Sequence, residues 1–151
     1  MQRPIPKIKV FIDTNVLIAG LSSVTGASAI ILDLCEAEVI QMVISRQVLV
    51  EADRNISAKI PNLVDRFRQF IHNLRPLMIE DPSPKAVERA ATIINRKDAP
   101  ILAAAEDAGV DFLITLDKKH FLNPKTRQKV MLKVVSPIEF LQDFQKLFQE
   151  K

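Results

Sequence analysis

The chain has 151 residues and a mass of 17.0 kDa, so we expect one domain that spans residues 1–151. Hydrophobic residues make up 48% of it, yet no apolar run approaches the roughly 18 residues that cross a membrane, and the first residues show no signal-peptide pattern. These features argue against a membrane protein and predict a cytoplasmic one. The net charge of +3 permits a polyanionic partner without requiring one.

The side chains that build zinc sites and base-stacking surfaces are scarce. Cys35 is the only cysteine, and only two histidines, His72 and His120, are present, without a Cys/His cluster. Trp and Tyr are absent, so we do not expect a surface that stacks several bases on aromatic rings, although eight Phe remain. A metal site in this chain is therefore expected to use oxygen ligands.

The first half of the chain alternates strand and helix signals after a short tail. Prolines in residues 1–7 exclude a regular element there, and the β-forming run that starts at Lys9 predicts a strand buried on both faces. Ser45 and Asn62 are placed to cap helices, and Pro61 ends the first of these. The expected elements are strands over 9–12 and 39–44 and helices over 16–20, 27–36, 46–59 and 63–74.

The second half continues the alternation. Ser83 precedes a proline at a helix start, Gly109 marks a helix end, and Ser136 with Glu139 forms a capping box. Because strands alternate with helices throughout, the chain is expected to form an α/β fold with a parallel sheet. The expected elements are strands over 77–79, 111–115 and 131–135, the last as a possible edge, and helices over 84–94, from 99 to Gly109, and from 137 onward.

Four acidic residues stand where such a sheet would gather them. Asp13 and Asp117 each follow an apolar strand, and the carboxyl ends of parallel strands share one edge, where open α/β sheets bind ligands. Glu51 lies on the helix after the second strand. Asp98 lies at a helix start, and its return to the same edge is left open. Clustered carboxylates repel one another unless a cation neutralises them, so the pattern predicts a site for Mg²⁺ or Mn²⁺.

Each of these acids also has an interpretation that needs no ligand. Asp98 is an ordinary helix N-cap, Glu51 a surface residue, Asp117 part of a plain turn and Asp13 part of an Asx turn. A carboxylate directly after an apolar strand is costly unless it is paired or functional. For this reason the functional interpretation is favoured, most strongly at Asp13.

The order and spacing of the motifs resemble the PIN-domain nucleases, in particular their bacterial toxin-like (VapC-like) branch. The likeness runs from about Lys9 to Leu141. One departure is Pro100, where the family more often has another residue, but a first-turn proline need not disturb the site. The motifs are Phe11-Ile12-Asp13-Thr14-Asn15-Val16-Leu17, Val48-Leu49-Val50-Glu51, Lys97-Asp98-Ala99-Pro100-Ile101-Leu102-Ala103-Ala104-Ala105, and Leu113-Ile114-Thr115-Leu116-Asp117-Lys118-Lys119-His120-Phe121.

The resemblance implies a three-layer α/β/α sandwich with a mainly parallel central sheet, and a metal-dependent ribonuclease that acts as the toxin of a toxin–antitoxin pair. It implies that Mg²⁺ or Mn²⁺ is bound by four catalytic acids, Asp13, Glu51, Asp98 and Asp117, with Asn15 and Thr115 as supporting polar residues. Nearby basic residues are candidates for holding RNA phosphates, with plain surface charge as the alternative; they are Arg46, Arg54, Arg96, Lys97, Lys118 and Lys119. His120 could also reach the cleft, but a lone histidine in a loop is more often incidental.

Two other functions stay open. A haloacid-dehalogenase-type phosphatase would carry a second acid two residues after Asp13, where this chain has Asn15, and threonine or valine in place of Leu17. A PIN-like module that binds RNA or a protein without cleaving would not need all four acids. Metal-dependent cleavage of RNA that is lost when Asp13 becomes Asn would separate the nuclease from both.

The expected partners are an RNA substrate, a cognate antitoxin protein and a second copy of the chain. The dimer is expected because two helices carry wide apolar faces, the helix over 62–74 and the last helix. On the last helix we expect Ile138, Leu141, Phe144 and Phe148 to face the core, while Phe140 and Leu147 widen the stripe. The alternative is that the two helices pack on each other within one chain.

Overall fold

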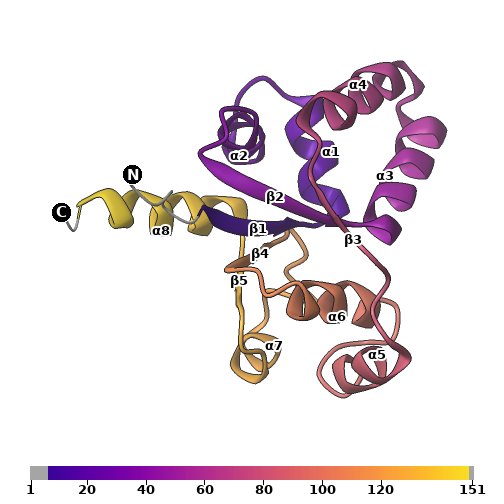
Figure 1. The fold of residues 1–151 in the computed structure, drawn as a ribbon, viewed down its shortest axis with the longest axis vertical. Coiled ribbons are helices and arrows are strands. Elements are labelled where there is room, and N and C mark those ends of the chain that lie inside the picture. Colours follow the sequence, from indigo (N-terminus) through magenta and orange to yellow (C-terminus); the bar gives the residue numbers. More distant parts are fainter. Residues whose placement is uncertain (1–6, 150–151) are drawn as a thin grey trace, which may run out of the picture.

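A five-stranded sheet, parallel throughout, forms the centre of the molecule (Figure 1). The computed structural model describes residues 7–149, so the expected tail lies outside the described residues except for Lys7. The strands are β1 (Ile8–Ile12), β2 (Ile40–Ser45), β3 (Leu77–Ile79), β4 (Phe112–Ile114) and β5 (Lys133–Val135). Their order in the sheet is β3-β2-β1-β4-β5, so the direction of sheet growth reverses between β1 and β4.

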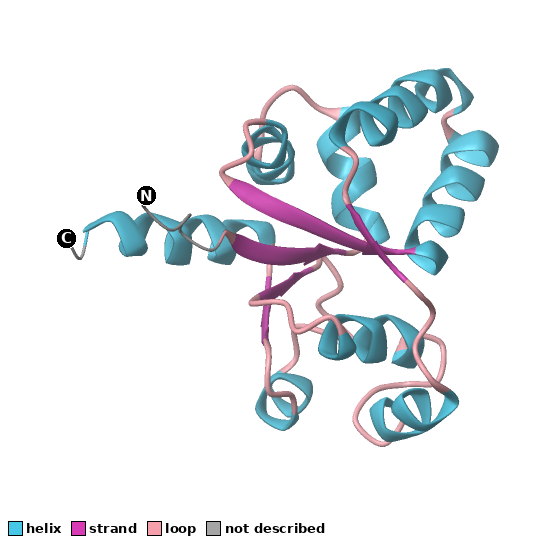
Figure 2. Ribbon diagram, viewed as in Figure 1, coloured by secondary structure: helices cyan, strands magenta, loops and turns pink. Residues whose placement is uncertain are grey.

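Helices cover both faces of the sheet, as Figure 2 shows in cyan. The helices are α1 (Thr14–Ser22), α2 (Ala27–Glu36), α3 (Arg46–Lys59), α4 (Val64–Leu74), α5 (Pro84–Ala90), α6 (Ala99–Asp107), α7 (Pro124–Lys129) and α8 (Pro137–Gln149). Figure 1 shows α1 to α4 on one side of the sheet and α5 to α7 on the other. This is the expected three-layer α/β arrangement, and α8 joins it by contacting α2, β4 and β5.

The apolar strands account for the centre of this arrangement. Phe11, Ile12 and Leu113 are fully buried, because the central strands β1 and β4 have helices against both faces. No single helix within residues 7–149 is long and apolar enough to cross a membrane; α1 and α2 satisfy that test of length and composition only as a pair, bent by 93°.

Most predicted elements are confirmed, and the differences occur where tertiary contacts override local signals. Asn62 does not cap a helix, because Pro61–Leu63 forms a 3-10 turn and α4 begins without a side-chain cap. The helix from Pro84 ends at Ala90 rather than residue 94. The hydroxyl of Thr92 donates to the Arg89 carbonyl at 2.7 Å, a local bond that favours a turn there. The short helix α7 was not predicted.

The predicted stripe of α8 is wrong at two positions. Phe140 is fully buried and packs edge-to-face on Phe112 of β4, with ring centroids 5.1 Å apart, whereas Ile138 is 63% exposed. The capping box fixes where the helix starts, and the sheet then covers the face that carries Pro137, Phe140 and Phe144. Apolar residues on several faces of α8 allowed more than one stripe, and packing selected between them. The side chain of Phe148 lies outside the described residues.

Candidate active site

The site lies at the carboxyl edge of the sheet, where the order of the strands reverses. Ile12 of β1 is paired with Ile114 of β4, so Asp13 and Thr115 follow directly on adjacent strands. In open α/β sheets, a crevice forms at such a reversal because the connections of the two strands leave toward opposite faces. This topology sets the carboxylate of Asp13 at the mouth of the crevice.

Asp13 accepts hydrogen bonds from the segments that follow β1 and β4. Its Oδ1 accepts from the backbone N–H of Thr14 at 2.8 Å, and its Oδ2 accepts from the hydroxyl of Thr115 at 2.8 Å. Asn15 donates to the same Oδ2 at 3.4 Å, and its own Oδ1 accepts the backbone N–H of Leu116 at 3.1 Å. Asn15 and Thr115 therefore tie the β1 and β4 ends together and orient the acid between them.

Burial sets the charge state of Asp13. Only 6% of the residue is exposed, and this desolvation raises the pKa of its carboxyl to about 6, against the hydrogen bonds from Thr115 and Thr14 that lower it. The negative charges of Asp98 and Glu51 raise the pKa further. A cation in this cleft would stabilise the charged form of Asp13. It would offset both the cost of burying that charge and the repulsion from Asp98 and Glu51.

Glu51 reaches the cleft from α3. Ser45, the last residue of β2, caps this helix by accepting the backbone N–H of Val48 at 3.2 Å, as predicted. Glu51 then stands one and a half turns into the helix, where its Oε2 accepts from the Thr14 hydroxyl at 3.3 Å and its Oε1 from Gln47 at 3.5 Å. These are long contacts, so its carboxylate is held less firmly than that of Asp13.

Asp98 does not act as the helix cap that its position suggested. It precedes α6, yet its side chain makes no capping bond, and its Oδ2 instead accepts from the amide of Asn95 at 2.7 Å. Because α6 leads into β4 and runs opposite to the strands, its first turn lies at the carboxyl edge. Asp98 therefore does return to the edge of the sheet that carries the other acids, and it lines the cleft there.

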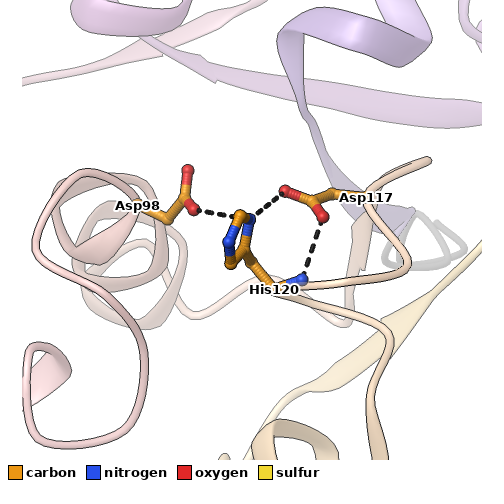
Figure 3. A group of neighbouring side chains, drawn as sticks. All are labelled: Asp98, Asp117 and His120. Carbon is orange, nitrogen blue, oxygen red and sulfur yellow. Dashed lines mark hydrogen bonds and ion pairs between the residues drawn. The ribbon is translucent and has the colours of Figure 1, made fainter.

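Asp117 and Asp98 meet at His120, as Figure 3 shows. The Nδ1 atom of His120 lies 3.1 Å from Asp117 Oδ2 and 3.5 Å from Asp98 Oδ2, and one ligand atom from each of the three residues lies within 4.8 Å of the others, close enough to share a metal ion. The backbone N–H of His120 donates to Asp117 Oδ1 at 2.9 Å. His120 thus contacts two of the acids, a position that the sequence allowed but did not favour; its spacing of three residues from Asp117 was the available signal.

All four predicted acids line one cleft of about 460 Å³. Of the six basic candidates only Lys97 lines it; Arg46 and Arg96 border other hollows, and Arg54, Lys118 and Lys119 are exposed. Sequence reasoning did not select Lys59, which also lines the cleft. The signal was available, because Asn55 and Lys59 follow Glu51 at intervals of four residues and so share its helix face.

Comparison of the sequence with family profiles identifies the family of the chain. Residues 9–119 match the family profile of the PIN domain. The chain belongs to the PIN-domain family. The match spans all the segments that bring acids to the cleft, from β1 through the turn after β4.

Several solved structures share the fold of this chain. VapBC2 from Rickettsia felis, described as bound to a DNA fragment from its promoter, is 19% identical over 85% of this chain and 98% of that chain, with a TM-score of 0.59. FitAcB from Neisseria gonorrhoeae is 16% identical over 85% and 97%, with a TM-score of 0.59. VapC20 from Mycobacterium tuberculosis, described as a Sarcin-Ricin loop cleaving toxin, is 13% identical over 73% and 91%, with a TM-score of 0.53. No curated protein sequence matches the chain. At these identities the likeness establishes the fold.

Proposed function

We propose that this PIN domain is a metal-dependent endoribonuclease that hydrolyses phosphodiester bonds in RNA, as the toxin of a toxin–antitoxin pair. The observation that carries the proposal is the convergence of four carboxylates, from four separate segments of the chain, on one cleft at the carboxyl edge of the sheet. Membership of a family of metal-dependent nucleases and the fold shared with VapC toxins support it.

The residues of the cleft fit a divalent cation. Within the described part of the chain, the ion pairs formed by Lys or Arg involve none of the four acids. Carboxylate oxygens are the ligands that Mg²⁺ and Mn²⁺ prefer. Asp13, Glu51, Asp98 and Asp117 would hold such an ion. When bound, the ion would stabilise the charge that develops on a phosphoryl group during hydrolysis.

The chain's own residues divide the remaining work. Thr115 and Asn15 each donate a hydrogen bond to the Asp13 carboxylate. Two hydrogen bonds, from Thr115 to Asp13 and from the Leu116 N–H to Asn15, cross between the ends of β1 and β4. Glu51 has only the long contacts at 3.3 and 3.5 Å, so it is the acid most free to accept a proton from an attacking water at Oε1 or Oε2.

Two lysines supply positive charge at the rim of the cleft. Lys59 and Lys97 both line it, from α3 and from the turn before α6. The other charged side chains that line the cleft are the four carboxylates, which repel an RNA phosphate, and these ammonium groups reduce that repulsion. Binding through them is expected to weaken as the salt concentration rises.

The decisive experiment is cleavage of RNA by the purified protein. We expect cleavage with Mg²⁺ or Mn²⁺, none in excess EDTA, and a loss of about 100-fold or more in Asp13→Asn. Asp107→Asn is the matched control, because Asp107 is an exposed acid at the far end of α6 and should leave cleavage unchanged. Undiminished cleavage in EDTA or in Asp13→Asn would overturn the proposal.

The same experiment separates the alternatives. Binding of RNA without cleavage under any metal would favour a non-catalytic module, and hydrolysis of a small phosphate ester would favour a phosphatase. For the toxin role we expect growth arrest on expression, relieved by the product of an adjacent antitoxin-like reading frame. Arrest by Asp13→Asn as strong as by the unaltered protein would refute a nuclease toxin.

A further inference from the structure

His120 completes a three-atom cluster that the four-acid description of the site does not contain. Its Nδ1 lies 3.1 Å from one Oδ of Asp117 and 3.5 Å from one Oδ of Asp98. Ligands held about 2.1 Å from one ion stand about 3 Å apart when they are neighbours in its coordination sphere. His120 Nδ1 therefore stands at about the spacing of neighbouring ligands from each carboxylate, and all three atoms lie within 4.8 Å of one another. Figure 3 shows the three side chains turned toward one another.

The backbone holds His120 in this position. Its N–H donates to Asp117 Oδ1, and its carbonyl accepts from the Asn123 amide at 3.0 Å and from the Thr126 hydroxyl at 2.9 Å. The next residue, Phe121, is fully buried and anchors the turn to the core. The turn is thus rigid on both sides of the histidine, and Nδ1 faces the two acids without rearrangement of the chain.

The geometry points to His120 as a nitrogen ligand of the ion held between Asp98 and Asp117, which makes the site favour first-row transition ions such as Mn²⁺ over Mg²⁺. This inference rests on the metal site of the proposed function and extends it. The chemical reason is that imidazole suits first-row transition ions, whereas Mg²⁺ takes oxygen ligands and keeps much of its water. The side chain is 41% exposed, so an ion can reach it from solvent.

The competing explanation is that His120 only pairs with the two acids as a cation. The two explanations differ in what happens when the imidazole is removed. If His120 is a ligand, its removal weakens the binding of the ion. If His120 is only a competing cation, its removal leaves the two acids free, and they bind the ion as well as before or better. Metal binding therefore distinguishes them without reference to catalysis.

The test is Mn²⁺ binding. Calorimetry measures the affinity, and electron spin-echo modulation detects nitrogen bound directly to Mn²⁺. The chain has only two histidines, so His72→Gln on α4 is a matched control for His120→Gln. We expect nitrogen modulation in the unaltered protein and in His72→Gln, its loss in His120→Gln, and a fall in Mn²⁺ affinity of about tenfold in that variant. Mg²⁺ affinity should change by less than about twofold, since its preferred ligands remain.

Each outcome decides a different claim. Mn²⁺ bound without nitrogen modulation in the unaltered protein, or bound equally well by His120→Gln, overturns the role of His120 and leaves the proposed nuclease standing. Failure of the unaltered protein to bind either ion at millimolar concentration overturns both. Thermal melting without metal shows whether His120→Gln is folded, which we expect because the His120 side chain is 41% exposed.

Discussion

Thr115 connects the two acids that follow β1 and β4, Asp13 and Asp117. Its side chain is fully buried; its hydroxyl donates to Asp13 Oδ2 at 2.8 Å and accepts the backbone N–H of Asp117 at 3.1 Å. One hydroxyl thus orients the acid that follows β1 and the turn that presents the acid after β4. Because the site is buried, water cannot take the place of this hydroxyl. Its removal would leave the groups that it bonds without those hydrogen bonds.

We predict that Thr115→Val lowers both stability and activity. The change keeps the shape of the side chain but leaves Asp13 Oδ2 with only the long 3.4 Å contact from Asn15 and removes the partner of the Asp117 N–H, which should cost about 1–3 kcal/mol in the free energy of unfolding. RNA cleavage should fall by at least tenfold, because Asp13 and Asp117 lose their relative position. Urea unfolding and cleavage rates measure the two effects.

Thr92→Val is the control for this prediction. The Thr92 hydroxyl also makes a hydrogen bond, but Thr92 is exposed, bonds to the nearby backbone carbonyl of Arg89, and lines a different hollow from the one that holds the acids. It should change the free energy of unfolding by less than about 0.5 kcal/mol and cleavage not at all. A Thr115→Val protein as stable and as active as the Thr92→Val protein would contradict the bridging role.

The sequence predicted which acids meet in the cleft but not how each is held. Asp13, Glu51, Asp98 and Asp117 were identified because strand ends and helix starts are visible as local patterns, and parallel topology brings them together. The contact of His120 with Asp98 was not predictable, because it joins residues of α6 and of the turn after β4 whose distance depends on packing. The same packing turned Asp98 away from the cap that its position suggested.

At the scale of elements, the start of α8 shows how a local motif and a long-range ion pair reinforce each other. Glu139 Oε1 accepts the backbone N–H of Ser136 at 2.9 Å, and the Ser136 hydroxyl accepts the N–H of Glu139 at 3.2 Å, the capping box predicted from sequence. Arg127 of α7 adds two hydrogen bonds to the same carboxylate at 2.9 Å each. The capping box was predictable because it is local, whereas α7 and its arginine were not.

These contacts lower the pKa of Glu139 from 4.5 to about 2, chiefly through the Arg127 hydrogen bonds and then that from Ser136. Because the folded protein holds the charged form, the stabilisation is complete above pH 4.5 and is lost as the pH falls through about 2. We predict that Glu139→Gln is less stable by about 0.5–1 kcal/mol at pH 7, a modest value since the carboxylate is 40% exposed. The difference should shrink steadily toward pH 2.

Urea unfolding at a series of pH values measures this difference. Glu88→Gln, which removes an exposed glutamate from α5, reports the general effect of losing one surface charge. High salt should reduce the deficit of Glu139→Gln at pH 7, because it screens a partly exposed pair. A deficit that stays constant from pH 7 to pH 3 would mean that the Arg127 pair contributes nothing to stability.

At the scale of the molecule, the alternation of strands and helices predicted the parallel α/β fold, but not which apolar surfaces the fold leaves open. Phe67 and Phe70 of α4 and Phe140 of α8 belong to the two helices whose wide apolar faces suggested a dimer, and all three are buried within the chain. Figure 1 shows α4 and α8 well apart, so the two helices do not cover each other. Phe70 and Phe140 are therefore unsuitable for mapping an interface, because their replacement would damage the core.

Among the exposed large hydrophobic residues of residues 7–149, Leu147 is the one that continues a buried helix stripe, at the end of α8. Figure 1 shows this helix extending beyond the strands, so the stripe that begins with Phe140 and Phe144 against the sheet continues to Leu147 where no strand covers it. Leu147 is 47% exposed and stands seven residues after Phe140, on the same helix face. An apolar stripe that runs off the body of a small protein is a natural contact for a second copy related by a two-fold axis.

We predict a two-fold dimer that forms through this end of α8. Light scattering at micromolar concentration should give about twice the chain mass of 17.0 kDa. Leu147→Glu should return it to 17.0 kDa, because a charge would be buried in the contact. Ile138→Glu is the matched control: Ile138 is 63% exposed on the same helix but nine residues before Leu147, on the opposite face, so its replacement should leave the dimer intact. A single-chain mass for the unaltered protein would reject the dimer, and a dimer lost in Ile138→Glu but kept in Leu147→Glu would place the contact on the other face of α8.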